Sequence, residues 1–101
     1  MFRSGQRIEA SRLQLIALRT AGDGGRVGYV IGKKLLGRAV DRNRLKRMLR
    51  EAIRLRRPAM RGFDLVIRLR QPCATDELSA VAAEAEGLLD RLAGSPAEAR
   101  R

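Results

Sequence analysis

Apolar residues recur at helical spacing inside the most basic stretch of the chain, residues 33–57. Leu45, Met48, Leu49, Ala52 and Ile53 fall at positions i, i+3, i+4, i+7 and i+8, the spacing of one apolar stripe on an α-helix. The same stretch holds eleven basic residues and two acids, so it carries +9 of the chain's net charge of +11. The pattern predicts a helix that packs on a core through one face and presents positive charge on the other.

Three residues indicate where this helix should begin and end. Asp41 is a candidate N-cap, and Gly37 favours a break before it. Pro58 should prevent continuation, because its ring clashes with the preceding turn and it lacks a backbone N–H. Arg56 falls near the apolar stripe, so we expect its side chain either to reach past the stripe to water or to lie in a frayed last turn.

The like charges on this helix favour a nucleic-acid partner over two alternatives. A helix that is merely solvated usually mixes charge signs, whereas Arg42, Lys46 and Arg50 repel one another by about a few tenths of a kcal/mol per pair. A membrane-surface helix should carry more Trp, Phe and Leu on its apolar face. A polyanion would relieve the repulsion, although charge does not decide between RNA and DNA.

The length of 101 residues leaves room for one domain with a single modest core. The chain has no apolar run of about 18 residues and no apolar segment near Met1, so we expect neither a membrane span nor a secretory signal. We therefore expect a cytoplasmic protein with one nucleic-acid-binding domain over residues 1–95 and a disordered tail over residues 96–101.

The composition argues against catalysis by side chains. With no His and only Cys73, the chain cannot form an internal disulfide, a zinc site of nitrogen and sulfur ligands, or a Ser-His or Cys-His nucleophile. We interpret Cys73 as a packing residue. Carboxylates could hold Mg²⁺ for nuclease chemistry, but the candidates are scattered among arginines: Glu9, Asp41, Glu51 and Asp64.

The rest of the chain predicts an α+β fold with the element order βββαβα. Strands are expected in four segments: residues 6–10, 11–20, 26–32 and 63–69. A closing helix is expected over residues 76–92, with Gly94 as its stop and acids that keep it away from a nucleic acid. Asp23-Gly24-Gly25 between two apolar runs favours an antiparallel hairpin of the second and third strands. We expect a two-layer α-β sandwich with a mainly antiparallel four-stranded sheet and both helices on one face.

Several short motifs resemble, in their order and spacing, the bacterial ribonuclease P protein component. In that family an RNR motif opens a long basic helix, and the whole series is far more specific than one such tripeptide. The likeness extends more weakly from about Phe2 to Leu92. The motifs are Val27-Gly28, Lys33-Lys34, Gly37-Arg38-Ala39-Val40, Arg42-Asn43-Arg44 and Lys46-Arg47.

The resemblance implies a fold, an activity and partners. The fold would include a left-handed βαβ crossover, where the general rule would give a right-handed one. The protein would be a non-catalytic subunit of an RNA enzyme, the endonuclease that removes the 5′ leader of precursor tRNA. Its cofactor Mg²⁺ would be bound by the RNA and not by a protein site. The implied partners are the catalytic ribonuclease P RNA and precursor tRNA, with no membrane, no DNA and a monomeric protein in the holoenzyme.

The resemblance also marks site residues, of which none would be catalytic. The RNA-binding set consists of nine positions that match the family's RNA-binding region and Arg54 on the same helix face: Lys33, Lys34, Arg38, Arg42, Asn43, Arg44, Lys46, Arg47, Arg50 and Arg54. Each basic residue could neutralise about one phosphate, which makes binding steeply salt-dependent, while Asn43 could equally cap a turn or hydrogen-bond a base edge or 2′-hydroxyl. Phe2 and Tyr29 are the candidates for binding the leader, since aromatic rings stack on unpaired bases. For Tyr29, core and surface positions stay open, and we interpret Phe63 as core.

Two departures from the family pattern and two rival functions remain. The family normally begins with a helix, of which only Met1–Ser4 would remain here, so either one wall of the leader cleft is missing or the start is too late. Gln14 and Ala17 stand where the family often has aromatic residues.

A DNA-binding regulator should show a packing helix before the basic one. A structural, ribosomal-type RNA-binding protein predicts binding to ribosomal RNA with no effect on precursor tRNA.

Overall fold

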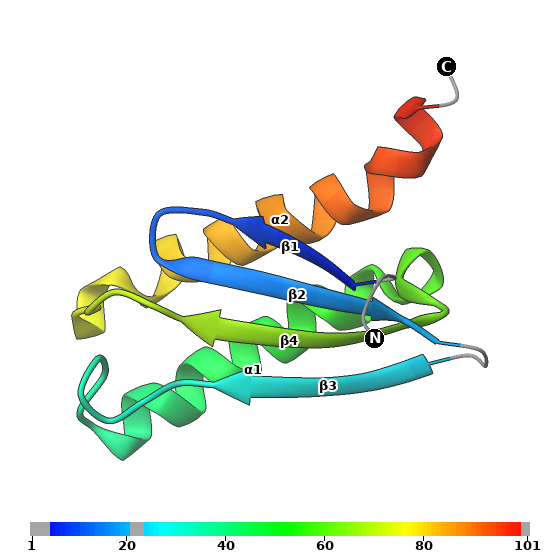
Figure 1. Cartoon of the computed structure of the whole chain (residues 1–101). Coiled ribbons are helices and arrows are strands. Elements are labelled where there is room, and N and C mark those ends of the chain that lie inside the picture. Colours follow the sequence, from blue (N-terminus) through cyan, green and yellow to red (C-terminus); the bar gives the residue numbers. More distant parts are fainter. Residues whose placement is uncertain (1–4, 21–23, 100–101) are drawn as a thin grey trace.

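The computed structural model describes residues 5–20 and 24–99 (Figure 1). Two short 3₁₀ helices are also present: η1 follows α1, and η2 precedes α2. The predicted order βββαβα is confirmed, with these bounds: β1 Gly5–Glu9, β2 Leu13–Arg19, β3 Gly24–Val30, α1 Ala39–Leu55, η1 Arg57–Met60, β4 Phe63–Leu69, η2 Thr75–Glu77 and α2 Leu78–Ala99.

The four strands form one sheet in the order β1-β2-β4-β3 (Figure 1). Strand β2 pairs antiparallel with both β1 and β4, while β3 pairs parallel with β4. The predicted hairpin of β2 and β3 is therefore wrong, because β4 lies between them. The composition of the turn depends only on neighbouring residues. The chain instead crosses over through α1, which places β4 inside the sheet, between β2 and β3. The left-handedness of this crossover stays a prediction from the family resemblance.

The apolar content of the strands explains why β4 is central. Its alternate residues Phe63, Leu65, Ile67 and Leu69 are all buried on one face, and Val66 is half-buried on the other. Such a strand gains most when a partner covers each edge. Strand β3 has glycines and an exposed Val30, so it takes an edge position at lower cost.

Both helices pack on the same face of the sheet, as predicted (Figure 1). The core contains the α1 residues of the predicted stripe, with Met48 packed at its border. Neither helix in the described part of the chain is both long and apolar enough to cross a membrane. The buried core side chains of β2, α1 and α2 are Leu13, Leu15, Ala17, Leu45, Leu49, Ala52, Ile53, Leu78, Val81, Ala85, Leu88, Leu89 and Leu92.

The helix ends differ from the predicted ones in three places. Arg38, not Asp41, occupies the N-cap of α1, and Asp41 lies in the first turn, where it is 3% exposed. Helix α1 ends at Leu55, two residues before the end predicted at Arg57, and its C-cap Arg56 reaches past the apolar stripe to Asp90 of α2. Helix α2 continues through Gly94, since one glycine costs only about 1 kcal/mol inside a helix. The disorder predicted for residues 96–101 stays a prediction.

Leu49 and Leu55 allow a test of the packing of α1, because they lie on the same helix with opposite burial. Leu49 is 0% exposed and Leu55 is 62% exposed. We expect Leu49→Ala to lower the free energy of unfolding by about 2–5 kcal/mol through lost burial and a cavity. Leu55→Ala should change it by less than about 0.5 kcal/mol. Urea unfolding followed by circular dichroism measures both, and equal effects would contradict the assigned core face.

Candidate nucleic-acid interface

The ten residues predicted to bind RNA lie together, on α1 and on the segment that leads into it. Eight of them are exposed, and Arg42 and Lys46 are half-buried. Within the described part of the chain, Arg44, Lys46 and Arg47 form no ion pair with an acid. Their charges are therefore not neutralised by the protein and are available to an anionic partner.

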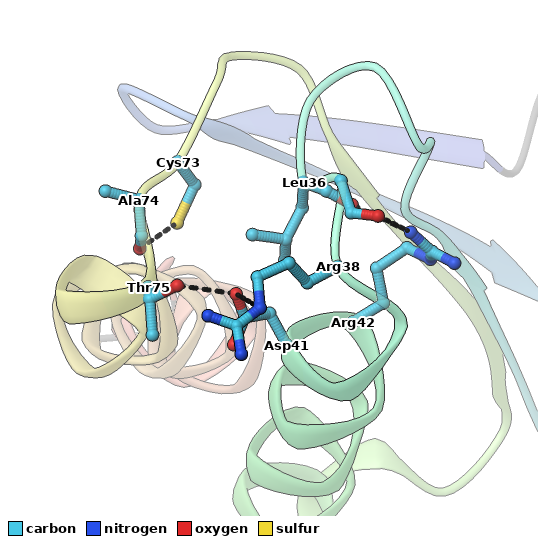
Figure 2. Close-up of polar contacts among 8 residues, drawn as sticks. Leu36, Arg38, Asp41, Arg42, Cys73, Ala74 and Thr75 are labelled. Carbon is cyan, nitrogen blue, oxygen red and sulfur yellow. Dashed lines mark hydrogen bonds and ion pairs between the residues drawn. The ribbon is translucent and has the colours of Figure 1, made fainter.

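The segment before α1 is tied to the first turn of the helix by Arg42. Its Nη1 donates hydrogen bonds to the carbonyl oxygens of Leu36 at 3.0 Å and Gly37 at 2.8 Å (Figure 2). The backbone N–H groups of Leu35 and Leu36 donate to the carbonyl of Gly32, which closes a turn around Lys33 and Lys34. Arg42 thus combines a positive charge with a structural role that its sequence position did not reveal.

Asp41 anchors the same end of the helix to the segment before α2. Its Oδ2 accepts a hydrogen bond of 2.6 Å from the Thr75 hydroxyl, and Arg38 Nε lies 4.0 Å away on the other side (Figure 2). The backbone N–H of Cys73 also donates to the Leu35 carbonyl at 3.1 Å. Together these bonds hold the basic segment on the folded domain. The signal in the sequence was that Asp41 is one of only two acids among the eleven basic residues of 33–57.

The C-terminal half of α1 uses two of its arginines for contacts within the protein. Arg54 donates to Glu51 at 2.6 and 3.0 Å, which lowers the pKa of Glu51, but the pair is exposed and screened by solvent. Arg56 donates to Asp90 of α2 at 2.6 Å and to the Ala52 carbonyl at 3.0 Å. This contact lowers the pKa of Asp90 and joins the two helices. The charge of Arg54, one of the residues predicted to bind RNA, is therefore already partly neutralised by Glu51.

Tyr29 lies beside the basic helix. Together with Val27 it packs at the border of the core, on the face of the sheet that the helices cover. Burial raises the pKa of Tyr29, while the charge and hydrogen bond of Arg50 oppose that rise. The structure thus brings Tyr29 next to Arg50 of the RNA-binding set. Phe2, the other leader candidate, lies outside the described residues, and the assignment of both residues to the leader stays a prediction.

The opposite face of the sheet is covered by neither helix. One row across the four strands consists of Arg7, Ile16, Val66 and Gly28, which are aligned by the strand registers. The neighbouring row contains Glu9, Gln14, Arg68 and the exposed Val30. This face, called here the open sheet face, is a mixed surface of apolar, polar and charged side chains, on which Arg7 and Arg68 are accompanied by the acid Glu9.

The acids of the described chain mainly serve the fold. Glu84 of α2 accepts from the backbone N–H of Arg12 at 2.8 Å, and Glu77 accepts from that of Ala74 at 2.9 Å. Cys73 is buried, and its burial raises the pKa of the thiol, which agrees with a packing role. Among residues 5–20 and 24–99, no three His, Cys, Asp or Glu side chains are grouped so that they could hold a metal ion.

A family model described as Ribonuclease P matches residues 1–93 of the chain. The chain belongs to the ribonuclease P protein family. The family suggested by the RNR motif and the other short motifs is thereby confirmed. The RNR motif, Arg42-Asn43-Arg44, lies at the N-terminal end of the basic face of α1.

Individual relatives agree with the family assignment. The ribonuclease P protein component of Ralstonia pickettii is 43% identical over 77 residues, which cover 75% of this chain and 55% of that protein. That of Nitrosomonas eutropha is 38% identical over 88 residues, covering 85% of this chain and 73% of that protein. The aligned segment thus spans little more than half of the Ralstonia protein's length.

Solved structures confirm the α+β fold class. The ribonuclease P protein of Thermotoga maritima matches with a TM-score of 0.70 at 28% identity, covering 89% of this chain and 86% of that chain. The Staphylococcus aureus ribonuclease P protein matches with a TM-score of 0.67 at 25% identity, covering 90% of this chain and 80% of that chain.

The anchor between Asp41 and Thr75 can be tested by unfolding. We expect Asp41→Ala to lower the free energy of unfolding by about 1.5–3 kcal/mol, because it removes a buried carboxylate that accepts a hydrogen bond. Glu51→Ala removes an exposed acid of the same helix and should leave the free energy of unfolding nearly unchanged. If the two variants had the same stability, Asp41 would not anchor the helix.

The contact between Arg50 and Tyr29 predicts a shift in a titration that is simple to assign, since Tyr29 is the only tyrosine and tryptophan is absent. Arg50 favours the phenolate, so Arg50→Ala should raise the Tyr29 pKa further. Because the folded-state pKa is raised, stability should fall as pH rises above about 10, where only the unfolded chain ionises. Ultraviolet absorbance of the phenolate measures the pKa. Arg47→Ala is the control, and an unchanged pKa in Arg50→Ala would refute the contact.

Proposed function

We propose that the chain is the protein subunit of the ribonuclease P ribonucleoprotein. In this role it binds the catalytic RNA and the 5′ leader of precursor tRNA, and it assists the RNA-catalysed, Mg²⁺-dependent removal of that leader. The observation that carries the proposal is the row of basic side chains on α1, which begins at the RNR motif in a member of this family. Within the described part of the chain, the exposed Arg44 and Arg47 of this row form no ion pair with an acid. The names of the relatives support it, since each is a ribonuclease P protein component.

The geometry of α1 suits binding to a polyanion. From Arg42 to Arg54 the helix rises by about 18 Å, so its charges can meet several successive phosphates. The planar guanidinium group of arginine can donate two parallel hydrogen bonds to one phosphate. The helix is held at its first turn by Asp41 and at its last by Arg56, so little ordering is required when RNA binds.

We assign the chemistry of phosphodiester hydrolysis to the RNA partner. The chain has no histidine, and its described acids form no group that fits a Mg²⁺ site. We therefore assign the Mg²⁺ that supports hydrolysis to the RNA. The protein's own contribution is electrostatic: its charges reduce the repulsion between two polyanions, the catalytic RNA and the precursor tRNA, and so lower the Mg²⁺ concentration that cleavage requires.

We assign the leader to the open sheet face, which does not include the predicted candidate Tyr29, because Tyr29 packs on the face that the helices cover. There Arg7 and Arg68 can meet phosphates, while Ile16 and Val66 offer apolar surface to bases. Gly28 has no side chain to cover Val66, so this part of the face stays flat. We further propose that the protein acts as a single copy in the cytoplasm, with no DNA or membrane partner.

The first test is cleavage of a precursor tRNA with a 5′ extension by ribonuclease P RNA at low Mg²⁺, with and without the protein. The protein should stimulate cleavage, and Arg44→Ala combined with Arg47→Ala should remove most of the stimulation. The slope of log affinity for the catalytic RNA against log salt should become shallower by about 1.5, since two phosphate contacts are lost.

The control is Arg91→Ala, which removes a positive charge from an exposed position on α2, outside both α1 and the open sheet face. This control should keep the stimulation. Tight, salt-sensitive RNA binding by the intact protein without any stimulation would instead favour a structural RNA-binding protein with no part in tRNA processing.

A further inference from the structure

A pocket lies between the C-terminal end of α1 and the first residues of β3 and β4. Its volume is about 250 Å³, just below the roughly 300–1,000 Å³ typical of small-molecule sites. Most of the lining is apolar, and two arginines complete it. The lining residues are Gly25, Val27, Ile53, Arg57, Met60, Arg61, Phe63 and Leu65.

The charges of this pocket are of one sign. Arg57 and Arg61 are exposed, and within the described part of the chain neither forms an ion pair with an acid. Phe63 is held in the wall by Arg19, whose guanidinium carbon lies 5.0 Å from the centre of the ring. An apolar floor beside unpaired guanidinium groups fits a flat, largely apolar group that carries a phosphate. A nucleotide has both parts, a base for the floor and a phosphate for the arginines.

The pocket continues the basic face of α1. Arg50 and Arg54 lie on successive turns of the helix, and Arg57 lies three residues further, at the pocket. An RNA strand that follows these arginines therefore reaches the pocket without leaving positive surface. A second copy of the chain fits poorly, since it would bring a net charge of +11 to the same region.

We propose that this pocket receives one unpaired base of an RNA strand bound along α1, while Arg57 and Arg61 bind the neighbouring phosphates. The inference deepens the proposed function, because it takes RNA as the partner and adds a base-binding site to a surface otherwise described by its charge. The base inserts between Val27 and Ile53, and hydrophobic contact rather than phosphate attraction alone fixes its position.

The test is nuclear magnetic resonance of the full chain with labelled methyl groups, titrated with adenosine 5′-monophosphate. We expect the methyl signals of Val27, Ile53 and Leu65 to shift, while those of Leu13 and Val81, buried away from the pocket, stay in place. Ribose 5-phosphate, which lacks the base, should leave the pocket methyl signals in place. Equal shifts with ribose 5-phosphate would mean that only phosphate is bound, and no shifts with the nucleotide would mean that no base is bound. Either result would overturn the proposal.

Two sets of variants make the test specific. Val27→Phe fills the pocket and should abolish the nucleotide-dependent shift at Ile53, whereas Val30→Phe, on the opposite face of the same strand, should preserve it. Arg57→Ala with Arg61→Ala leaves the core intact and should weaken nucleotide binding by at least about tenfold. An unchanged affinity in this double variant would overturn the role of the arginines, even if Val27→Phe fails to fold.

The same titration separates this inference from the proposed function. Pocket shifts in a protein that does not stimulate precursor tRNA cleavage would support the base site and overturn the role in ribonuclease P. Stimulation of cleavage without pocket shifts would overturn the base site alone.

Discussion

Burial of the apolar stripe of α1 is the interaction on which the rest of the structure depends. Like charges along this helix repel one another by about a few tenths of a kcal/mol per pair, so the helix is poorly stabilised by its own surface. Leu45, Leu49 and Ile53 offset this repulsion, because a fully buried side chain of this kind contributes about 1.5–3 kcal/mol. The core therefore keeps a cationic helix folded before any anion is bound, and the basic face of α1 is formed in advance.

Local pattern in the sequence was sufficient for the elements of the fold but not for their pairing. Alternation and helical spacing depend only on neighbouring residues, and they located β4 and the buried stripe of α1 correctly. Strand pairing depends on residues distant in the chain, so the turn at Asp23-Gly24-Gly25 suggested a hairpin although β4 separates the two strands. Asp41 shows the same limit, since cap statistics favoured it as an N-cap while Thr75, 34 residues away, holds it inside the first turn.

The positive charge of the candidate site could be predicted from the sequence, but the contacts that each arginine makes could not. Spacing placed Arg47 and Arg50 on the exposed face, and the structure agrees. It could not show that Arg42 binds backbone carbonyls or that Arg54 pairs with Glu51, because such contacts depend on side-chain positions. The pocket was also beyond reach, since its walls come from β3, α1, η1 and β4.

These contacts divide the arginines of one helix into two groups with different physical roles. Arg42 and Arg56 satisfy acceptors of the protein itself and fix the two ends of the helix, so part of their hydrogen-bonding capacity is already used. Arg44 and Arg47 have no such acceptor in the described chain, so their full charge meets solvent. A polyanion gains most from the second group, because no internal contact must be broken before a phosphate is bound. High positive charge and a defined fold are compatible here because different residues of the same helix supply them.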